Sequence, residues 1–126
     1  MLLFMKEHID PILNGRKTET RRIWKLKRAR VGSVHRAKTK MLSTECFAFL
    51  KILDVYKQRL GDITDESIRA EGYDSLEGYK AALEKANRKH GFKWDDNLEV
   101  YVIKFKLLDD AIANGLYGSE VIKKGD

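Results

Sequence analysis

The sequence contains only one cysteine, Cys46, and one proline in 126 residues, and it has no long apolar run. A single cysteine excludes an internal disulfide, so a hydrophobic core must stabilise the fold; a chain with 43% hydrophobic residues can form one. The apolar opening at residues 1–5 is much shorter than the roughly 20 residues that span a membrane, and the charged residues after it do not resemble a leader-cleavage sequence. We therefore expect a single-domain cytoplasmic protein with no membrane contact.

Signals for metals and cofactors are also missing. The three histidines lie far apart, at positions 8, 35 and 90, and none has metal-ligand spacing to Cys46. Cys46 alternates with Ala48 and Leu50, which is typical of a small buried residue in a strand. The sequence also lacks a P-loop and a dinucleotide-binding fingerprint. We expect neither a metal nor a cofactor.

The charge, in contrast, is abundant and very unevenly distributed. The net charge is +6, but residues 16–40 alone hold eleven Lys or Arg against one acid, Glu19, while the rest of the chain holds 14 basic and 18 acidic residues. A concentrated block of this kind creates a positive potential that attracts phosphate-bearing partners. For residues 25–30 considered alone, a solvated basic loop is an equally good interpretation.

The basic block begins in the stretch 14–22, which combines a helix stop with a strand start. Gly15 suits the position just past a helix end, where the backbone turns left-handed. Strand side chains alternate with period two, so Thr20 and Arg22 face one side of the chain and their neighbours face the other. With Lys17 at the start of this strand, an ammonium, a hydroxyl and a guanidinium are predicted to converge on one solvent-accessible cleft.

The remaining pattern predicts a small mixed fold. We predict strands near residues 2–5, 18–25, 34–39, 44–56 and 98–107, a short helix over 7–14, and two further helices that begin after the N-cap residues Thr64 and Ser75. Short strands with inserted helices and no regular β-α alternation favour an α+β fold with a barrel-like sheet. Residues 109–126 are expected to form a poorly ordered tail.

The motif Gly15-x-Lys17-x-x-Thr20-x-Arg22, after a short helix and before a Val-Gly-Ser turn, resembles the ASCH domain (activating signal cointegrator homology), whose pattern is G-x-K-x-x-E/T-x-R. The resemblance covers about residues 1–108, and the last predicted strand, YVIKF, agrees with it. It implies a small PUA-like β-barrel of about five to six strands, with a short N-terminal helix and a two-helix insert.

One branch of this family implies catalysis. Small bacterial members with Gly-Arg-Lys-Thr-x-Thr at this position are amidohydrolases that deacylate N4-acetylcytidine, and the resemblance implies Lys17, Thr20 and Glu71 as the catalytic residues. Glu71 is assigned from its position before the second insert helix, and Glu66 is the competing choice. Thr20 can attack an amide if Lys17 is neutral, and the neighbouring arginines disfavour its ammonium form, while Arg22 can stabilise the oxyanion. An ordinary Lys17–Glu71 ion pair beside a structural threonine fits the same residue types.

We expect the chain to bind RNA or a modified nucleoside through the basic cleft. Hydrolysis of an N4-acylated cytidine is the alternative, and an adaptor for an acidic protein partner is a third class. Trp24 and Tyr73 can either stack on a base or pack in the core. The predicted RNA-binding or nucleotide-binding residues are Arg16, Lys17, Arg21, Arg22, Trp24, Lys25, Lys27, Arg28, Arg30, Arg36 and Lys38.

Overall fold

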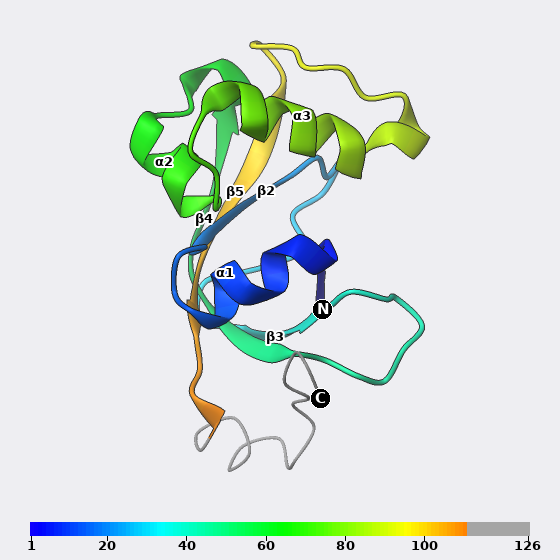
Figure 1. Ribbon diagram of the computed structural model, residues 1–126, viewed down its shortest axis with the longest axis vertical. Helices are drawn as coiled ribbons and strands as arrows, with labels where there is room; N and C mark the ends of the chain where they lie inside the picture. Colours follow the sequence, from blue (N-terminus) through cyan, green and yellow to red (C-terminus); the bar gives the residue numbers. More distant parts are fainter. Residues whose placement is uncertain (111–126) are drawn as a thin grey trace.

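The computed structural model describes residues 1–110, which form one five-stranded sheet with short helices around it (Figure 1). The strands are β1 (Leu2–Leu3), β2 (Glu19–Arg22), β3 (Val34–Lys38), β4 (Ala48–Arg59) and β5 (Glu99–Leu107). The α-helices are α1 (Ile9–Leu13), α2 (Asp65–Ala70) and α3 (Leu76–Ala86), and 3-10 turns occupy Lys6–His8, Leu60–Asp62 and Arg88–His90. Every predicted strand and helix within the described range is present. The predicted tail lies outside the described residues from position 111 onward.

The sheet is an open half-barrel in the order β1-β3-β4-β5-β2. Only β1 and β3 pair in parallel, and the other three neighbouring pairs are antiparallel. The long strand β4 carries a bulge, where the register with β5 shifts between Ile52 and Asp54. A bulge bends a strand and increases its twist, which curls the sheet around the core. Strand β2 lies at one edge of the sheet.

The backbone before β2 is fixed by two helices from distant parts of the sequence. Gly15 follows α1 with φ +82°, the left-handed conformation predicted for it. The backbone N–H of Lys17 then donates to Pro11 O in α1 (2.9 Å), and that of Thr18 donates to Ala70 O at the end of α2 (2.8 Å). Position 17 is thereby held next to the C-terminal end of α2.

The two insert helices begin where the sequence predicted. Thr64 Oγ1 accepts a hydrogen bond from the backbone N–H of Ser67, and Ser75 Oγ accepts one from Gly78, both at 3.1 Å. Such caps satisfy backbone donors that a helix start leaves unpaired. Helices α2 and α3 enclose a small apolar cluster against the sheet that comprises Leu60, Ile68, Tyr79, Leu83 and Val100. In Figure 1, β2 passes between this helical pair and α1.

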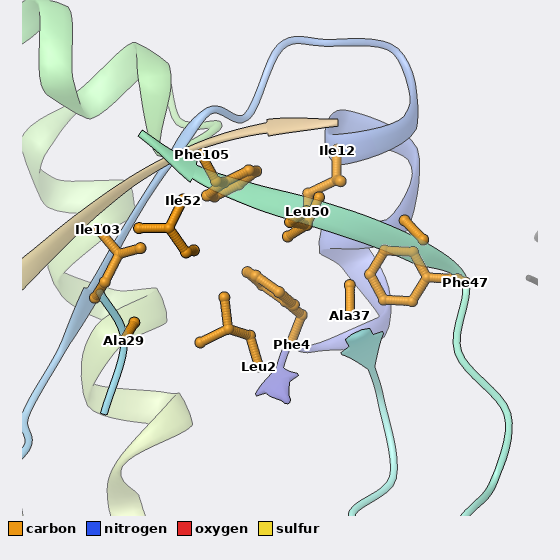
Figure 2. Packing of buried hydrophobic residues seen from close by; sticks show 11 residues of the cluster. Leu2, Phe4, Ile12, Ala29, Ala37, Phe47, Leu50, Ile52, Ile103 and Phe105 are labelled. Carbon is orange, nitrogen blue, oxygen red and sulfur yellow. The ribbon is translucent and has the colours of Figure 1, made fainter. Parts of the chain in front are cut away.

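A larger cluster fills the concave side of the sheet (Figure 2). Phe4 lies among residues from β1, β3, β4 and β5, and its ring packs edge-to-face against Phe47 and Phe105 with centroids 6.2 and 6.1 Å away. Edge-to-face aromatic pairs add stability beyond the area that they bury. The segment before α1 is therefore anchored in the core rather than loosely attached.

Several predicted strand boundaries are wrong: β1 ends at Leu3 rather than at residue 5, β2 ends at Arg22 rather than at residue 25, and β4 is displaced towards the C-terminus. Strand β4 begins at Ala48 rather than Thr44, because the chain between β3 and β4 turns through a loop up to residue 47 (Figure 1). The predicted alternation therefore fails at its start: Cys46 packs with Phe49, while Phe47 joins the main cluster. Cys46 is nevertheless buried, as expected.

No helix within residues 1–110 has the length and hydropathy that a membrane crossing requires.

Candidate functional site

A cavity of about 400 Å³ opens beyond the β2 edge of the sheet. Lys17, Thr20 and Arg22 line it together, as the motif spacing predicted. Its other walls come from the N-terminal segment, the end of α2 and the inner face of α3, and they include Phe4, His8, Glu71, Tyr73, Tyr79 and Asn87. We call this space the Lys17 cavity. Its volume lies in the range of small-molecule binding sites.

Glu71 is the centre of a buried hydrogen-bonded network in this cavity. Lys17 Nζ donates to Glu71 Oε1 and also to the Glu71 backbone oxygen, both at 2.8 Å. Glu71 Oε2 accepts from Arg21 Nη1 at 3.1 Å and from the Tyr79 hydroxyl at 3.3 Å. Glu71 is only 3% exposed and Lys17 only 2%. Glu66, the competing choice for the insert carboxylate, is exposed.

Local backbone geometry brings the two charges together. Glu71 is the C-cap residue of α2, so its carbonyl is one of the oxygens that a helix end leaves unpaired, and the Lys17 ammonium satisfies it. Gly72 follows with φ +99°, and a Cβ at that position would lie 3.8 Å from Lys17 Cβ. That distance is an ordinary van der Waals contact, so position 72 favours glycine because of its positive φ and not because of crowding.

The pKa of Lys17 is lowered, chiefly because burial removes water from the ammonium. Glu71 opposes this shift, while the charges of Arg22 and Arg21 add to it. The direction matches the sequence-based expectation, but the leading cause is burial rather than the neighbouring arginines. A buried lysine with a lowered pKa at a cavity wall is a recognised mark of functional sites.

Arg22 is held in one orientation while its terminal nitrogens stay free. Its Nε donates to Thr20 Oγ1 at 3.0 Å, and its guanidinium carbon lies 4.8 Å from the centroid of the Phe4 ring. Nη1 and Nη2 make no hydrogen bond with any residue in the range 1–110, and both remain accessible to solvent. Burial lowers the pKa of Arg22 to about 10, so it keeps its charge at neutral pH. The result is a positioned fork of N–H donors that faces the cavity.

Arg21, which the sequence predicted as an RNA-binding residue, also lines the cavity, but its guanidinium already has protein partners. Its side chain is fully buried, and its guanidinium donates to Glu71, Glu19 (3.1 Å) and Gln58 (3.0 Å from Nη2). The period-two prediction was right about its face of the strand, but at the sheet edge this face meets Glu71. Arg21 is therefore a partner of the buried carboxylate.

Aromatic rings form the remaining wall of the cavity. His8 Nε2 lies 2.7 Å from the Tyr73 hydroxyl, and their rings pack edge-to-face with centroids 5.8 Å apart. Tyr73 in turn packs against Tyr79 at 5.7 Å. Burial and the nearby Lys17 charge lower the pKa of His8 to about 4, and burial raises the pKa of Tyr73 to about 12. Both side chains are therefore neutral at physiological pH.

Several solved structures share this architecture. An ASCH domain from Lactobacillus crispatus matches 79% of this chain and 69% of its own, with 16% identity and a TM-score of 0.61. The chain has the fold of an ASCH domain. A DUF984 protein from Enterococcus faecalis matches with 15% identity, a TM-score of 0.65 and coverage of 92% and 76% of the two chains. A Tyr-to-Phe mutant of an ASCH protein from Zymomonas mobilis matches with 10% identity, a TM-score of 0.53 and coverage of 92% and 78%. No family model matches the sequence, and no curated protein does.

The ASCH fold separates the predicted basic residues into two places. Lys27, Arg28 and Arg30 line a second, shallower hollow with Ser33 and His35, and no residue there borders the Lys17 cavity. The other predicted binding residues border neither space: Arg16, Trp24, Lys25, Arg36 and Lys38. The single basic cleft predicted from the sequence is therefore two separate sites.

Several of these outlying residues have structural partners. Arg16 forms an exposed ion pair with Asp74 at 2.6 Å. Trp24 packs against the main core and lies 5.9 Å from the Tyr101 ring. Lys38 is buried and donates to Met41 O at 3.2 Å. Core packing is thus the better description of Trp24, whereas Tyr73 does lie in the cavity wall.

Phe4, His8 and Tyr79 were not predicted as site residues in this ASCH fold. Phe4 lies in the short apolar run at residues 1–5, and Tyr79 lies at an apolar position of the second insert helix; such positions are typical of core residues. His8 had been considered only as a metal ligand, and within residues 1–110 no group of His, Cys, Asp or Glu side chains is arranged to hold a metal ion. These three residues line the cavity because the sheet order brings their segments close to β2, and local sequence patterns do not reveal that order.

The neutral state of His8 predicts a pH dependence of stability. Its pKa is about 4 in the folded protein and near its ordinary value of 6.5 when unfolded, so the unfolded chain binds more protons between these values. The free energy of unfolding should fall as the pH drops from 6.5 towards 4, by about 2 kcal/mol after discounting for partial exposure. Urea unfolding at pH 7 and pH 4.5 measures this. His8→Gln, which cannot titrate, should show a smaller drop; an equal drop would contradict the assignment.

Proposed function

We propose that the chain binds one pyrimidine nucleoside unit, either free or in single-stranded RNA, in the Lys17 cavity. The observation that supports this most strongly is the Arg22 guanidinium, positioned by Thr20 and Phe4 with both terminal nitrogens free. Arg22 is only partly buried, so a ligand can reach its free donors and complete their hydrogen bonds. Its fork of donors matches phosphate or a carbonyl oxygen of a nucleoside.

The aromatic wall supports a nucleobase as the second part of the ligand. Proteins that recognise unpaired bases stack them on aromatic or arginine planes and read their polar edges. The cavity offers such planes at the Tyr73 ring and the Arg22 guanidinium, together with the charged Lys17. Its volume of about 400 Å³ suits a single nucleoside rather than a duplex.

The basic loop, residues 25–30, supports RNA as the larger ligand. Lys25, Lys27, Arg28 and Arg30 are all exposed, and three of them line the second hollow. Exposed cations of this kind neutralise phosphates and release counterions, which gives affinity without base specificity. Such a loop is expected to hold the RNA backbone while the cavity holds one base.

Titrations with cytidine 5′-monophosphate and with a single-stranded RNA test both parts. Arg22→Met should weaken mononucleotide binding by about tenfold or more, whereas Arg16→Met, at an exposed arginine outside the cavity, should leave it within about twofold. Neutralising the basic loop to glutamine should weaken RNA binding and flatten its salt dependence while sparing the mononucleotide. A wild-type protein that binds neither ligand would refute the proposal.

Amide hydrolysis of an N4-acylated cytidine is a second candidate, because a specific observation favours it. Lys17 has a lowered pKa and lines the same cavity as the Thr20 hydroxyl. In the proposed reaction, Thr20 Oγ bonds to the acyl carbon as its proton passes to neutral Lys17. Lys17 then protonates the departing N4 nitrogen, the C–N bond breaks, and water hydrolyses the threonine ester.

The unliganded geometry shows what this reaction requires. The Lys17 ammonium donates to Glu71, and the Thr20 hydroxyl oxygen accepts from Arg22. In this arrangement the Lys17 ammonium and the Thr20 hydroxyl are not hydrogen-bonded to each other. Proton transfer therefore needs an intervening water or a rotation of one side chain. Arg22 is placed beside the Thr20 oxygen, where its free nitrogens can stabilise the negative charge that develops on the acyl oxygen.

A further inference from the structure

Most polar groups of the Lys17 cavity already have partners. Each carboxylate oxygen of Glu71 accepts from a buried donor, and the Thr20 oxygen accepts from Arg22. The charged groups, Lys17 and Arg22, are donors only. A nucleobase with an exocyclic N–H needs an acceptor, and Glu71 is poorly suited to be that acceptor because it is only 3% exposed and both its oxygens already accept from buried donors.

The His8–Tyr73 pair is the neutral, adaptable group in this wall. It contains one short hydrogen bond, 2.7 Å between His8 Nε2 and the Tyr73 oxygen, and two rings set nearly perpendicular at 88°. Tyr73 Oη has a second lone-pair direction left, and His8 Nδ1 forms no bond with residues 1–110. Both residues border the same cavity as Lys17 and Arg22.

We infer that Tyr73 Oη, with its proton held by His8 Nε2, is the acceptor that reads an N–H on the base edge of the ligand. This inference rests on the proposed nucleoside site and deepens it: it selects bases that carry an exocyclic N–H. His8 acts as a positioning residue, because it fixes the direction of the phenolic proton and leaves the oxygen lone pair facing the cavity.

The chemistry of the pair favours this direction of the bond. A phenolic O–H is a stronger donor than a neutral imidazole N–H, and an imidazole nitrogen is a stronger acceptor than a phenolic oxygen. A proton shared in this way also polarises the phenol, which strengthens Oη as an acceptor for the next donor in the chain. Burial is the main reason that the pKa of His8 is lowered, to about 4; Lys17 and Arg22 act in the same direction, and Glu71 and Glu7 oppose it. His8 is therefore neutral near pH 7, as the arrangement requires.

The first test needs no ligand. In nitrogen-detected NMR spectra of the free protein at pH 7, His8 should be neutral and protonated on Nδ1, because Nε2 accepts from Tyr73. In Tyr73→Phe this preference should disappear. A free protein with the proton on Nε2 would overturn the inference, because Tyr73 would then be a donor to the ligand.

The second test compares cytidine with N4,N4-dimethylcytidine, which lacks the exocyclic N–H. Wild type should prefer cytidine by about tenfold, as expected for one neutral hydrogen bond to a buried acceptor. Tyr73→Phe should reduce this ratio to near one, and His8→Leu should lower it. His8→Gln should keep most of it, since the glutamine oxygen can accept the tyrosine proton.

Asn87 supplies the matched control, because it also lines the cavity and carries an amide. Its Nδ2 donates to Leu83 O at 2.8 Å. Asn87→Ala should leave the cytidine preference unchanged. If Asn87→Ala removes the preference, or if Tyr73→Phe keeps it, the inference is wrong while the nucleoside site stands. If wild type binds neither nucleoside, the proposed function and the inference fail together.

Discussion

Replacing Glu71 by alanine is expected to lower the free energy of unfolding by about 3–5 kcal/mol, the usual result of removing one partner from a buried ion pair. Lys17 would lose its carboxylate partner in a site where it is 2% exposed, and Arg21 would lose one of its acceptors. The Tyr79 hydroxyl would lose its acceptor as well. Each group left unpaired in the interior adds its own desolvation cost.

Urea unfolding of Glu71→Ala beside Glu66→Ala measures this effect. Glu66 lies in α2, five residues earlier, and it is exposed, so its replacement should change stability by no more than about 0.5 kcal/mol. Glu71→Gln keeps the side-chain shape but removes the charge, and it should fall between the two. Equal stability for the alanine variants at 66 and 71 would show that the buried network does not hold the site together.

The second large effect concerns hydrolysis. If the chain deacylates N4-acetylcytidine, Thr20→Ala should reduce turnover by about 10³-fold or more, because loss of a nucleophile removes the chemical step. Thr20→Ser, which retains the hydroxyl and the acceptor for Arg22, should keep much of the activity. Product formation from N4-acetylcytidine provides the measurement.

Thr18→Ala is the control for this reaction. Thr18 lies two residues away, is exposed, and holds its place through its backbone N–H rather than its side chain. Its turnover should therefore match wild type. Full activity in Thr20→Ala would exclude the threonine as nucleophile and leave the cavity as a binding site.

Local sequence signals predicted the parts of the fold that local chemistry determines. Gly15 marks a helix end, and Thr64 and Ser75 cap their helices as expected. The period of two in β2 correctly placed Thr20 and Arg22 on one face. These features depend on backbone geometry within a few residues, so composition and spacing are enough to find them.

The composition of the site needed long-range information. The C-terminal end of α2 lies next to β2, so Glu71 accepts hydrogen bonds from both Lys17 and Arg21. Phe4 and His8 join the cavity because β1 pairs with β3 and anchors the N-terminal segment. Neither the sheet order nor the depth of burial that controls the Lys17 pKa follows from local pattern.

The charge block shows the same limit. Its eleven basic residues are close together in the sequence and suggest a single basic surface. In the fold, Lys17, Arg21 and Lys38 are buried, and the basic loop is exposed at a separate hollow. Net charge predicts attraction to phosphate but not which cations remain free. Arg21 and Arg22 are neighbours in β2, but within residues 1–110 only Arg22 of the two has terminal nitrogens without a hydrogen bond.

Chemical-shift mapping with cytidine 5′-monophosphate locates the ligand on the wild-type protein and so distinguishes the Lys17 cavity from the basic loop. A nucleotide in the cavity should shift the signals of Lys17, Thr20, Arg22, His8 and Tyr73 most, with saturation at a single affinity. Shifts confined to the basic loop at residues 25–30, with the Lys17 cavity signals unmoved at saturation, would contradict the proposed site.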